Sequence, residues 1–326
     1  MFDYLEKSFF LHKTVFLNDP IISMAVFKVE KTKDKKAIFP YGHTSAGKNK
    51  QVVLGKLYSE YLERFKMSAN SRYTQETQLI SLQNLKPRQI NRSMLGYDID
   101  KAYGKKDTTG TASGLRSAFI IEKAIMELIE KNELMLMWYK KYCKKLIKTK
   151  LVKDIITQYG LQTNAVEIFY SQNISNIHTI AFFIFDSKKQ IVGSGISGDK
   201  NSVNALKSAI EEAIMQHLLN KSFFIDFKTP EFKKYFLNLS MTIEKININT
   251  LKPIKKIEIQ KEFNDIEIGL LNISAQQREI TIKALSRRML NCVPFLGNIK
   301  CNLDKYIVKY FEIDKEVENA LQCPVI

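Results

Sequence analysis

Two pairs of glutamates stand three residues apart in segments whose apolar residues recur at helical spacing: Glu60 with Glu63, and Glu127 with Glu130. Residues at this spacing share one face of an α-helix, so each pair presents two carboxylates side by side. Such carboxylates repel each other, and on a face that is otherwise apolar they need a cation. Four carboxylates carry about −4 of charge, which two Mg²⁺ ions would balance, and Mg²⁺ prefers oxygen ligands shared between carboxylates and phosphates. The pattern therefore predicts a nucleotide whose phosphates are held by metal.

A single pair of this kind has a plainer interpretation, because such pairs are common on solvated helix faces. Two pairs, each behind a glycine-containing segment in an apolar helix, favour a site. A ferritin-like di-iron site is disfavoured, because it needs a histidine three residues after a glutamate and none of the four histidines stands there.

Three glycine-containing loops, at residues 42–48, 109–114 and 193–198, each lead into an expected amphipathic helix, which indicates a weak internal repeat. The expected helices cover residues 52–65, 116–139 and 203–219. Strands are expected at residues 21–29, 165–170, 178–185 and 266–273. The expected fold class is α/β, a mixed α+β arrangement, in one domain over residues 1–326.

Two of the loops resemble nucleotide-binding motifs without completing them. Gly47 and Lys48 end a Walker A-like segment, but Asn49 stands where the magnesium-binding Ser or Thr belongs. Residues 193–198 read GxGxxG, yet no acidic residue closes a following strand about 20 residues on. Neither a P-loop nor a Rossmann dinucleotide site is expected.

The chain is strongly basic, with 50 Lys and Arg against 34 Asp and Glu and a net charge of +16. An excess of this size is typical of proteins with an anionic partner. Part of it is local, because seven lysines fall within residues 140–153 and resemble a solvated helix face. A nucleic-acid-binding protein is therefore an alternative, but it ranks last because the chain shows no recognisable reading module.

The four cysteines lie far apart without a CxxC pair, which predicts free thiols rather than a zinc cage or a disulfide framework. The apolar runs are far shorter than the ~20 residues of a membrane span. No transmembrane helix is expected. The N-terminus lacks the basic start and apolar centre of a secretory signal, so the predicted location is the cytoplasm.

Three stretches in order over residues 42–220 resemble the YcaO family. Gly47-Lys48 through residues 59–64 is similar to its first element, a GK loop leading to a helix that ends E-x-x-E-R. Residues 110–130 resemble the second, a small-residue loop and a helix with E-L-x-E. Ser194-Gly195 with the following helix resembles the third, G-x-G followed by A-L-x-x-A-x-x-E-A.

This resemblance implies a YcaO-like single domain, with mixed sheets and three loop-helix repeats around an ATP site. It implies ATP and Mg²⁺ as cofactors, and Glu60, Glu63, Glu127 and Glu130 as the metal ligands. Lys48 and Arg64 would then neutralise phosphate charge. The remaining implied residues are Lys131, Glu212 and His217 at the nucleotide, and the terminal carboxylate of Ile326 as a catalytic group.

Members of the resembled family use ATP to activate a peptide amide oxygen. The implied function is a cyclodehydratase subunit, resembling stand-alone microcin-type subunits, that converts Cys, Ser or Thr of a ribosomally made precursor peptide to thiazoline or oxazoline in a bacteriocin or similar pathway. No separate leader-peptide-binding domain is expected. The expected partners are therefore the precursor peptide and a leader-recognition protein resembling ubiquitin-activating enzymes; a flavin-dependent azoline dehydrogenase and a second copy of the chain are further candidates.

Two alternatives stay within this resemblance. A change of nucleophile would give a thioamide- or amidine-forming enzyme. A degenerate scaffold that binds a partner without turnover is suggested by Leu115, Phe119 and His217, which occupy positions where polar residues of the family often meet the nucleotide. Other departures are Thr109, Met215 and Lys131, the last replacing the Arg that follows E-x-x-E.

Overall fold

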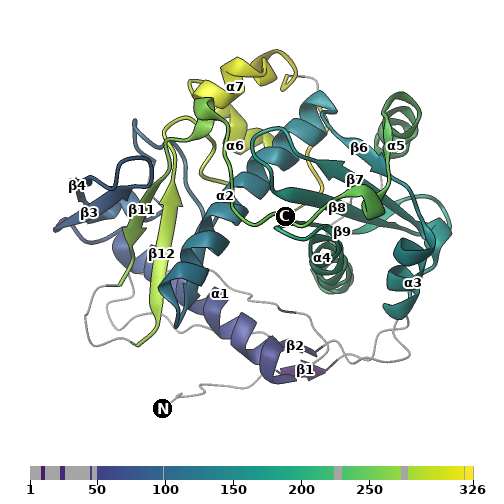
Figure 1. The fold of residues 1–326 in the computed structure, drawn as a ribbon, viewed down its shortest axis with the longest axis horizontal. Helices are drawn as coiled ribbons and strands as arrows, with labels where there is room; N and C mark the ends of the chain where they lie inside the picture. Colours follow the sequence, from purple (N-terminus) through teal and green to yellow (C-terminus); the bar gives the residue numbers. More distant parts are fainter. Residues whose placement is uncertain are drawn as a thin grey trace. The chain divides into compact units, whose positions relative to one another are not determined.

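The computed structural model describes residues 9–11, 23–25, 45, 50–97, 99–223, 230–272, 278–318 and 320–325 of the 326-residue chain (Figure 1). The chain divides into two compact units. Unit 1 comprises residues 1–13, 21–128 and 262–292, and unit 2 comprises residues 14–20, 129–261 and 293–326. The helix α2 (Ser117–Lys140) contributes its first part to unit 1 and its second part to unit 2.

Unit 1 contains an antiparallel five-stranded sheet with the strand order β4-β3-β11-β12-β5. Figure 1 shows β11 and β12 as neighbouring strands of this sheet. The strands are β3 (Glu76–Ser81), β4 (Pro87–Asn91), β5 (Thr111–Gly114), β11 (Glu267–Leu270) and β12 (Ile280–Leu285). The helix α1 (Lys50–Asn70) packs against β5 and β12. The short helix η1 (Arg92–Leu95) and an antiparallel ribbon of β1 (Phe9–Leu11) and β2 (Ser23–Ala25) complete the unit.

Unit 2 contains a mixed five-stranded sheet with the order β10-β6-β7-β8-β9, in which only β10 and β6 are parallel. Its strands are β6 (Lys144–Leu146), β7 (Val166–Ser171), β8 (His178–Phe185), β9 (Ile191–Asp199) and β10 (Lys245–Ile246). Its helices are α3 (Lys150–Gln158), α4 (Ser202–Phe223), α5 (Pro230–Thr242), α6 (Leu296–Lys300) and α7 (Tyr306–Tyr310). Short turns of helix are η2 (Thr163–Ala165), η3 (Ile248–Thr250) and η5 (Ile313–Lys315), while η4 (Lys261–Phe263) crosses the unit boundary.

Glycines on β9 allow α4 to lie directly against the strand. A Cβ built on Gly195 would stand 2.4 Å from the carbonyl oxygen of Ala209 and 2.5 Å from the amide nitrogen of Ala213, both on α4. A Cβ on Gly193 would stand 2.4 Å from the carbonyl oxygen of Ala213. Small residues on both elements therefore permit the close approach of strand and helix backbones.

Two of the three predicted loops are strands, which corrects the sequence prediction. Residues 111–114 form β5, and residues 193–198 lie within β9. The error arose from interpreting glycine as a turn residue, whereas the glycines of β9 serve close helix packing. Gly110, at φ +77°, is a real turn position that only glycine adopts without strain. Of the first loop, residues 42–48, only Ser45 lies within the described residues.

The expected helices and most expected strands are confirmed within a few residues. The helices α1, α2 and α4 correspond to the three predicted segments, and β7 and β8 to the predicted strands at 165–170 and 178–185. Residues 267–270 form β11, while Ile273 lies outside the described residues. Of the strand predicted at 21–29, the described part is β2.

The lysine-rich segment at residues 140–153 is not one helix face, contrary to the sequence prediction. It contains the end of α2, the strand β6 and the beginning of α3. The ammonium of Lys148 turns inward and donates to the carbonyl oxygens of Thr163 at 2.8 Å and Val166 at 2.5 Å. Sheet pairing therefore overrode the helical appearance of this segment.

The four cysteines are free thiols, as predicted. Among the helices of the described residues, none combines the length and apolar character needed to cross a membrane.

Replacing Gly195 by Ala should lower the free energy of unfolding by about 3 kcal/mol, the upper range for overpacking, because the new methyl group meets backbone atoms that cannot move aside. Gly297→Ala, in α6 of the same unit, is the matched control: nothing lies within 4 Å of its Cβ position. Alanine there should change stability by less than about 1 kcal/mol. Urea denaturation measures both. Equal effects of the two substitutions would contradict the packing argument.

Candidate functional site

Glu63 of α1 is a buried carboxylate in unit 1, with 6% of its surface exposed. The helix buries Val53, Leu57 and Met67 at helical spacing, and Glu63 falls on the same stripe. Its Oε1 accepts the backbone N–H of Ser113 at 2.9 Å. Burial raises the pKa of Glu63 to about 7, against the opposing charge of Lys123, whose ammonium lies 3.7 Å from Oε1.

Two further predicted metal ligands, Glu127 and Glu60, influence the same ammonium electrostatically. The charge of Glu63 raises the pKa of Lys123 most, and those of Glu127 and Glu60 raise it further. Glu60 also forms an ion pair of 2.6 Å with Arg64, one helical turn further along α1. Unit 1 therefore brings together three of the four predicted metal ligands and one predicted phosphate-neutralising residue.

The fourth predicted ligand, Glu130, lies in unit 2, where it caps the outer edge of β9. Its Oε2 accepts the N–H of Gly198 at 2.9 Å. Two other side chains cap alternate positions of the same edge. The Glu212 carboxylate accepts the N–H of Ile196 at 2.7 Å, and the Gln216 amide oxygen accepts the N–H of Ser194 at 2.7 Å. That all four glutamates converge on one nucleotide stays a prediction.

Lys131 joins Glu130 and Glu212 within unit 2. Its ammonium lies 2.9 Å from Oε1 of Glu130 and 3.8 Å from Oε1 of Glu212, and only 7% of the residue is exposed. His217 instead directs Nδ1 to the carbonyl oxygen of Val192 at 2.8 Å, near the beginning of β9. Of the predicted nucleotide-binding residues in this unit, Lys131 and Glu212 therefore lie together. Lys48 and Ile326 lie outside the described residues.

Sequence reasoning missed several polar side chains near these carboxylates. Lys123 could have been found, because it stands four residues before Glu127 on the same helix.

Glu133 was also missed. It continues the three-residue spacing after Glu130, and it is fully buried. Its carboxylate accepts the Ser171 hydroxyl and the N–H groups of Asn173 and Ile174, each at 2.6 Å. Glu133 therefore anchors α2 to the end of β7 within unit 2.

A buried lysine of β12 supports the loop before β5. The Lys283 ammonium donates to the carbonyl oxygen of Asp107 at 2.6 Å and to that of Thr109. Burial lowers the pKa of Lys283 to about 8. No sequence motif marked it, because its function depends on the carbonyls that the fold places around it.

The carboxylates of unit 1 have the chemistry that Mg²⁺ requires. The described part of the chain contains no set of three or more His, Cys, Asp or Glu side chains arranged to hold a metal by themselves. A magnesium–nucleotide site does not need one, since Mg²⁺ takes one or two carboxylates together with phosphate oxygens and water. A divalent ion would stabilise the charged form of Glu63, whose burial otherwise favours the protonated form. Glu60, Glu63 and Glu127 therefore fit as ligands.

Comparison with known proteins identifies one family. A family model described as "YcaO cyclodehydratase, ATP-ad Mg2+-binding" matches residues 54–265, so the predicted cofactors are those that the family's own description names. No curated protein matches the chain.

Solved structures share the fold. A YcaO protein from Methanopyrus kandleri, bound with AMPPCP and Mg²⁺, aligns with a TM-score of 0.64 and 10% identity over 83% of each chain. The E. coli microcin synthetase McbBCD complex with pro-MccB17 bound aligns with a TM-score of 0.61 and 13% identity, over 86% of this chain and 87% of that chain. A heterocyclase in complex with substrate and cofactor aligns with a TM-score of 0.62 and 12% identity, over 91% of this chain and 52% of that chain. These likenesses confirm the predicted fold class.

The pH dependence of stability should change when Glu63 is replaced by Gln. Because the folded-state pKa is about 7, above the ordinary 4.5, the folded wild type binds this proton more tightly than the unfolded chain does. Its stability should therefore fall as the pH rises from about 4.5 through about 7, by up to about 1.4 kcal/mol per pH unit. Glutamine keeps an oxygen for Ser113 but cannot ionise.

Urea denaturation in EDTA between pH 5 and pH 8 tests this expectation. The stability of Glu63→Gln relative to the wild type should rise with pH. Glu122→Gln, which removes the same charge from α2, is the control. Parallel curves for the wild type and Glu63→Gln would contradict a raised pKa at this position.

Proposed function

The chain belongs to the YcaO family, and from this premise we propose that it is an ATP-dependent cyclodehydratase subunit that converts Cys, Ser or Thr of a ribosomally made precursor peptide to azolines. The observation that carries the proposal is the carboxylate cluster of unit 1. The ammonium of Lys123 lies 3.7 Å from Glu63, and the charges of Glu63, Glu127 and Glu60 raise the pKa of this lysine. In this proposal, residues 1–326 form one YcaO-like domain, and Glu130 is the fourth Mg²⁺ ligand.

The roles of the residues follow from charge and donor type. Glu60, Glu63 and Glu127 would hold Mg²⁺, which supplies neutralisation of phosphate charge when it is bound. Arg64, already on the same helix face as Glu60, offers a planar fork of donors to a phosphate, and Lys48 offers a point charge. Lys131 and Glu212 would position the nucleotide from unit 2, and His217 of α4, which contacts the beginning of β9, would add to this.

In the proposed reaction, the side-chain thiol or hydroxyl of the substrate gives up its proton, its sulfur or oxygen adds to the preceding carbonyl carbon, and the carbonyl oxygen takes the negative charge. The carbonyl oxygen takes the γ-phosphoryl group of ATP and leaves as phosphate, while the amide nitrogen gives up its proton and the C=N bond forms. The net change is loss of one water from the peptide and conversion of ATP to ADP and phosphate. Positioning and electrostatics would supply most of the catalysis.

The C-terminal segment is held firmly within unit 2. The carbonyl oxygen of Pro324 accepts the hydroxyl of Ser194 at 2.7 Å and the Nε2–H of Gln216 at 2.9 Å, and Val325 is fully buried. Ile326 lies outside the described residues, and the catalytic role of its terminal carboxylate stays a proposal.

The proposed partners are the precursor peptide and a leader-recognition protein resembling ubiquitin-activating enzymes. The microcin synthetase relative is itself a complex with pro-MccB17 bound, which supports a heteromeric assembly. A flavin-dependent azoline dehydrogenase, a second copy of the chain and a cytoplasmic location remain predictions.

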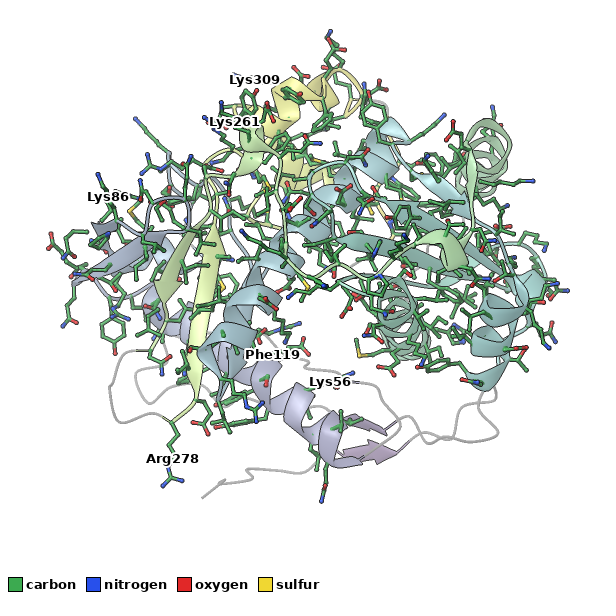
Figure 2. All side chains as sticks on the ribbon, viewed as in Figure 1. Lys56, Lys86, Phe119, Lys261, Arg278 and Lys309 are labelled. Carbon is green, nitrogen blue, oxygen red and sulfur yellow. The ribbon has the colours of Figure 1, made fainter. Side chains whose placement is uncertain are left out.

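The second candidate is a scaffold subunit without turnover. Leu115 and Phe119 are 72% and 65% exposed, and Figure 2 labels Phe119 near the beginning of α2. Polar contacts to a nucleotide are not available from these side chains. A thioamide- or amidine-forming enzyme is the remaining alternative within the family.

Replacing Glu60 or Glu127 by Gln should lower peptide-dependent ATP hydrolysis by about 100-fold, because each removes a carboxylate that would hold the Mg²⁺ ion, whose positive charge stabilises the phosphoryl group. Intact-mass analysis of a precursor peptide, with ATP, Mg²⁺ and partner proteins, should show a loss of ~18 Da per ring with wild type. Glu122→Gln should keep both activities.

Three results distinguish the candidates. Unchanged product formation by Glu60→Gln and Glu127→Gln would favour the scaffold. A gain in peptide mass would indicate a thioamide. Loss of water from a peptide whose Cys, Ser and Thr are all replaced by Ala would indicate an amidine.

A further inference from the structure

Lys123 lies among carboxylates that the proposed function assigns to Mg²⁺. Its ammonium is 3.7 Å from Oε1 of Glu63, close enough for an ion pair and too far for a hydrogen bond. Glu127 and Glu60 act on the same ammonium. One cation therefore lies beside one predicted metal ligand, and the charges of two more raise its pKa.

The oxygens of Glu63 are largely engaged. Oε1 accepts the N–H of Ser113 at 2.9 Å, and Oε2 faces the hydroxyl of Thr111 at 3.4 Å. Oε1 also lies 3.7 Å from the ammonium of Lys123. A metal ion bound to this oxygen would therefore stand close to that ammonium.

Charge makes joint occupancy unfavourable. A divalent cation and an ammonium a few ångströms apart repel each other strongly in a partly buried site. Lys123 can leave, because 46% of its side chain is exposed and its four-carbon stem is flexible. Arg64 is instead held by its 2.6 Å ion pair with Glu60.

We propose that Lys123 is a resident counter-ion that holds the Glu60, Glu63 and Glu127 carboxylates together between nucleotide-binding events and withdraws when Mg²⁺ takes its place. The inference rests on the proposed function, in which these carboxylates bind Mg²⁺. Lys123 is on this view a positioning residue that sets the affinity for the metal, rather than a group that contacts substrate.

The test is to titrate the full chain with MgCl₂ at constant ionic strength, with and without AMPPCP, and to measure the melting temperature at each concentration. The midpoint is the Mg²⁺ concentration that gives half of the total rise in melting temperature. Lys123→Met should melt at a lower temperature in EDTA, because Glu63 has lost its counter-ion. Its Mg²⁺ midpoint should be roughly fivefold lower than that of wild type, the effect of removing a half-exposed ion pair. Lys123→Arg keeps the charge and should have a midpoint equal to or above that of wild type.

Lys86→Met is the matched control, since it removes an exposed lysine of unit 1 from the segment between β3 and β4 (Figure 2). Its midpoint should equal that of wild type. A Lys123→Met midpoint equal to or higher than that of wild type would overturn the inference. So would a loss of AMPPCP-dependent stabilisation with an unchanged response to Mg²⁺ alone, because Lys123 would then be a phosphate ligand.

Glu63→Gln separates this inference from the proposed function. If wild type responds to Mg²⁺ and AMPPCP, Glu63→Gln does not, and Lys123→Met matches wild type, only the counter-ion role fails. If neither wild type nor Lys123→Met responds to Mg²⁺ with AMPPCP, the proposed function fails and the inference fails with it.

Discussion

Capping of strand-edge N–H groups by helix carboxylates is the interaction on which both units depend. Glu63 accepts the N–H of Ser113 on β5, while Glu130 and Glu212 accept those of Gly198 and Ile196 on β9. A buried edge N–H without a partner is costly, and so is a buried carboxylate without donors or a cation. The N–H group and the carboxylate each provide the hydrogen-bond partner that the other needs, and this fixes the carboxylates in place. In Glu130 and Glu212 the second carboxylate oxygen faces the ammonium of Lys131.

The two units use the same device with different helices. In each, an edge strand with glycine lies against a helix whose glutamate caps it, and a lysine of α2 balances the charge. Lys123 does so in unit 1 and Lys131 in unit 2. This correspondence lies in the strand-edge caps and not in the three glycine-containing loops from which the sequence indicated a repeat.

The same arrangement explains how the fold can be shared at low sequence identity. The solved relatives share the fold at 10–13% identity. What the arrangement requires is an acceptor at each edge N–H and a small residue wherever helix and strand touch. In this chain Gly195 against Ala209 meets the second requirement. Most other core positions need only apolar side chains of suitable volume.

The sequence by itself determined the helices α1, α2 and α4, the strands β7 and β8, and the glutamate pairs, because periodicity and i,i+3 spacing are local properties. It did not determine that residues 193–198 are a strand, or that Lys148 turns inward, because sheet pairing joins segments far apart in the chain. Only the tertiary structure placed Lys123 beside Glu63, since those side chains come from different helices and meet only where α1 and α2 contribute to the same unit. Charge partners across elements depend on packing, which no local pattern encodes.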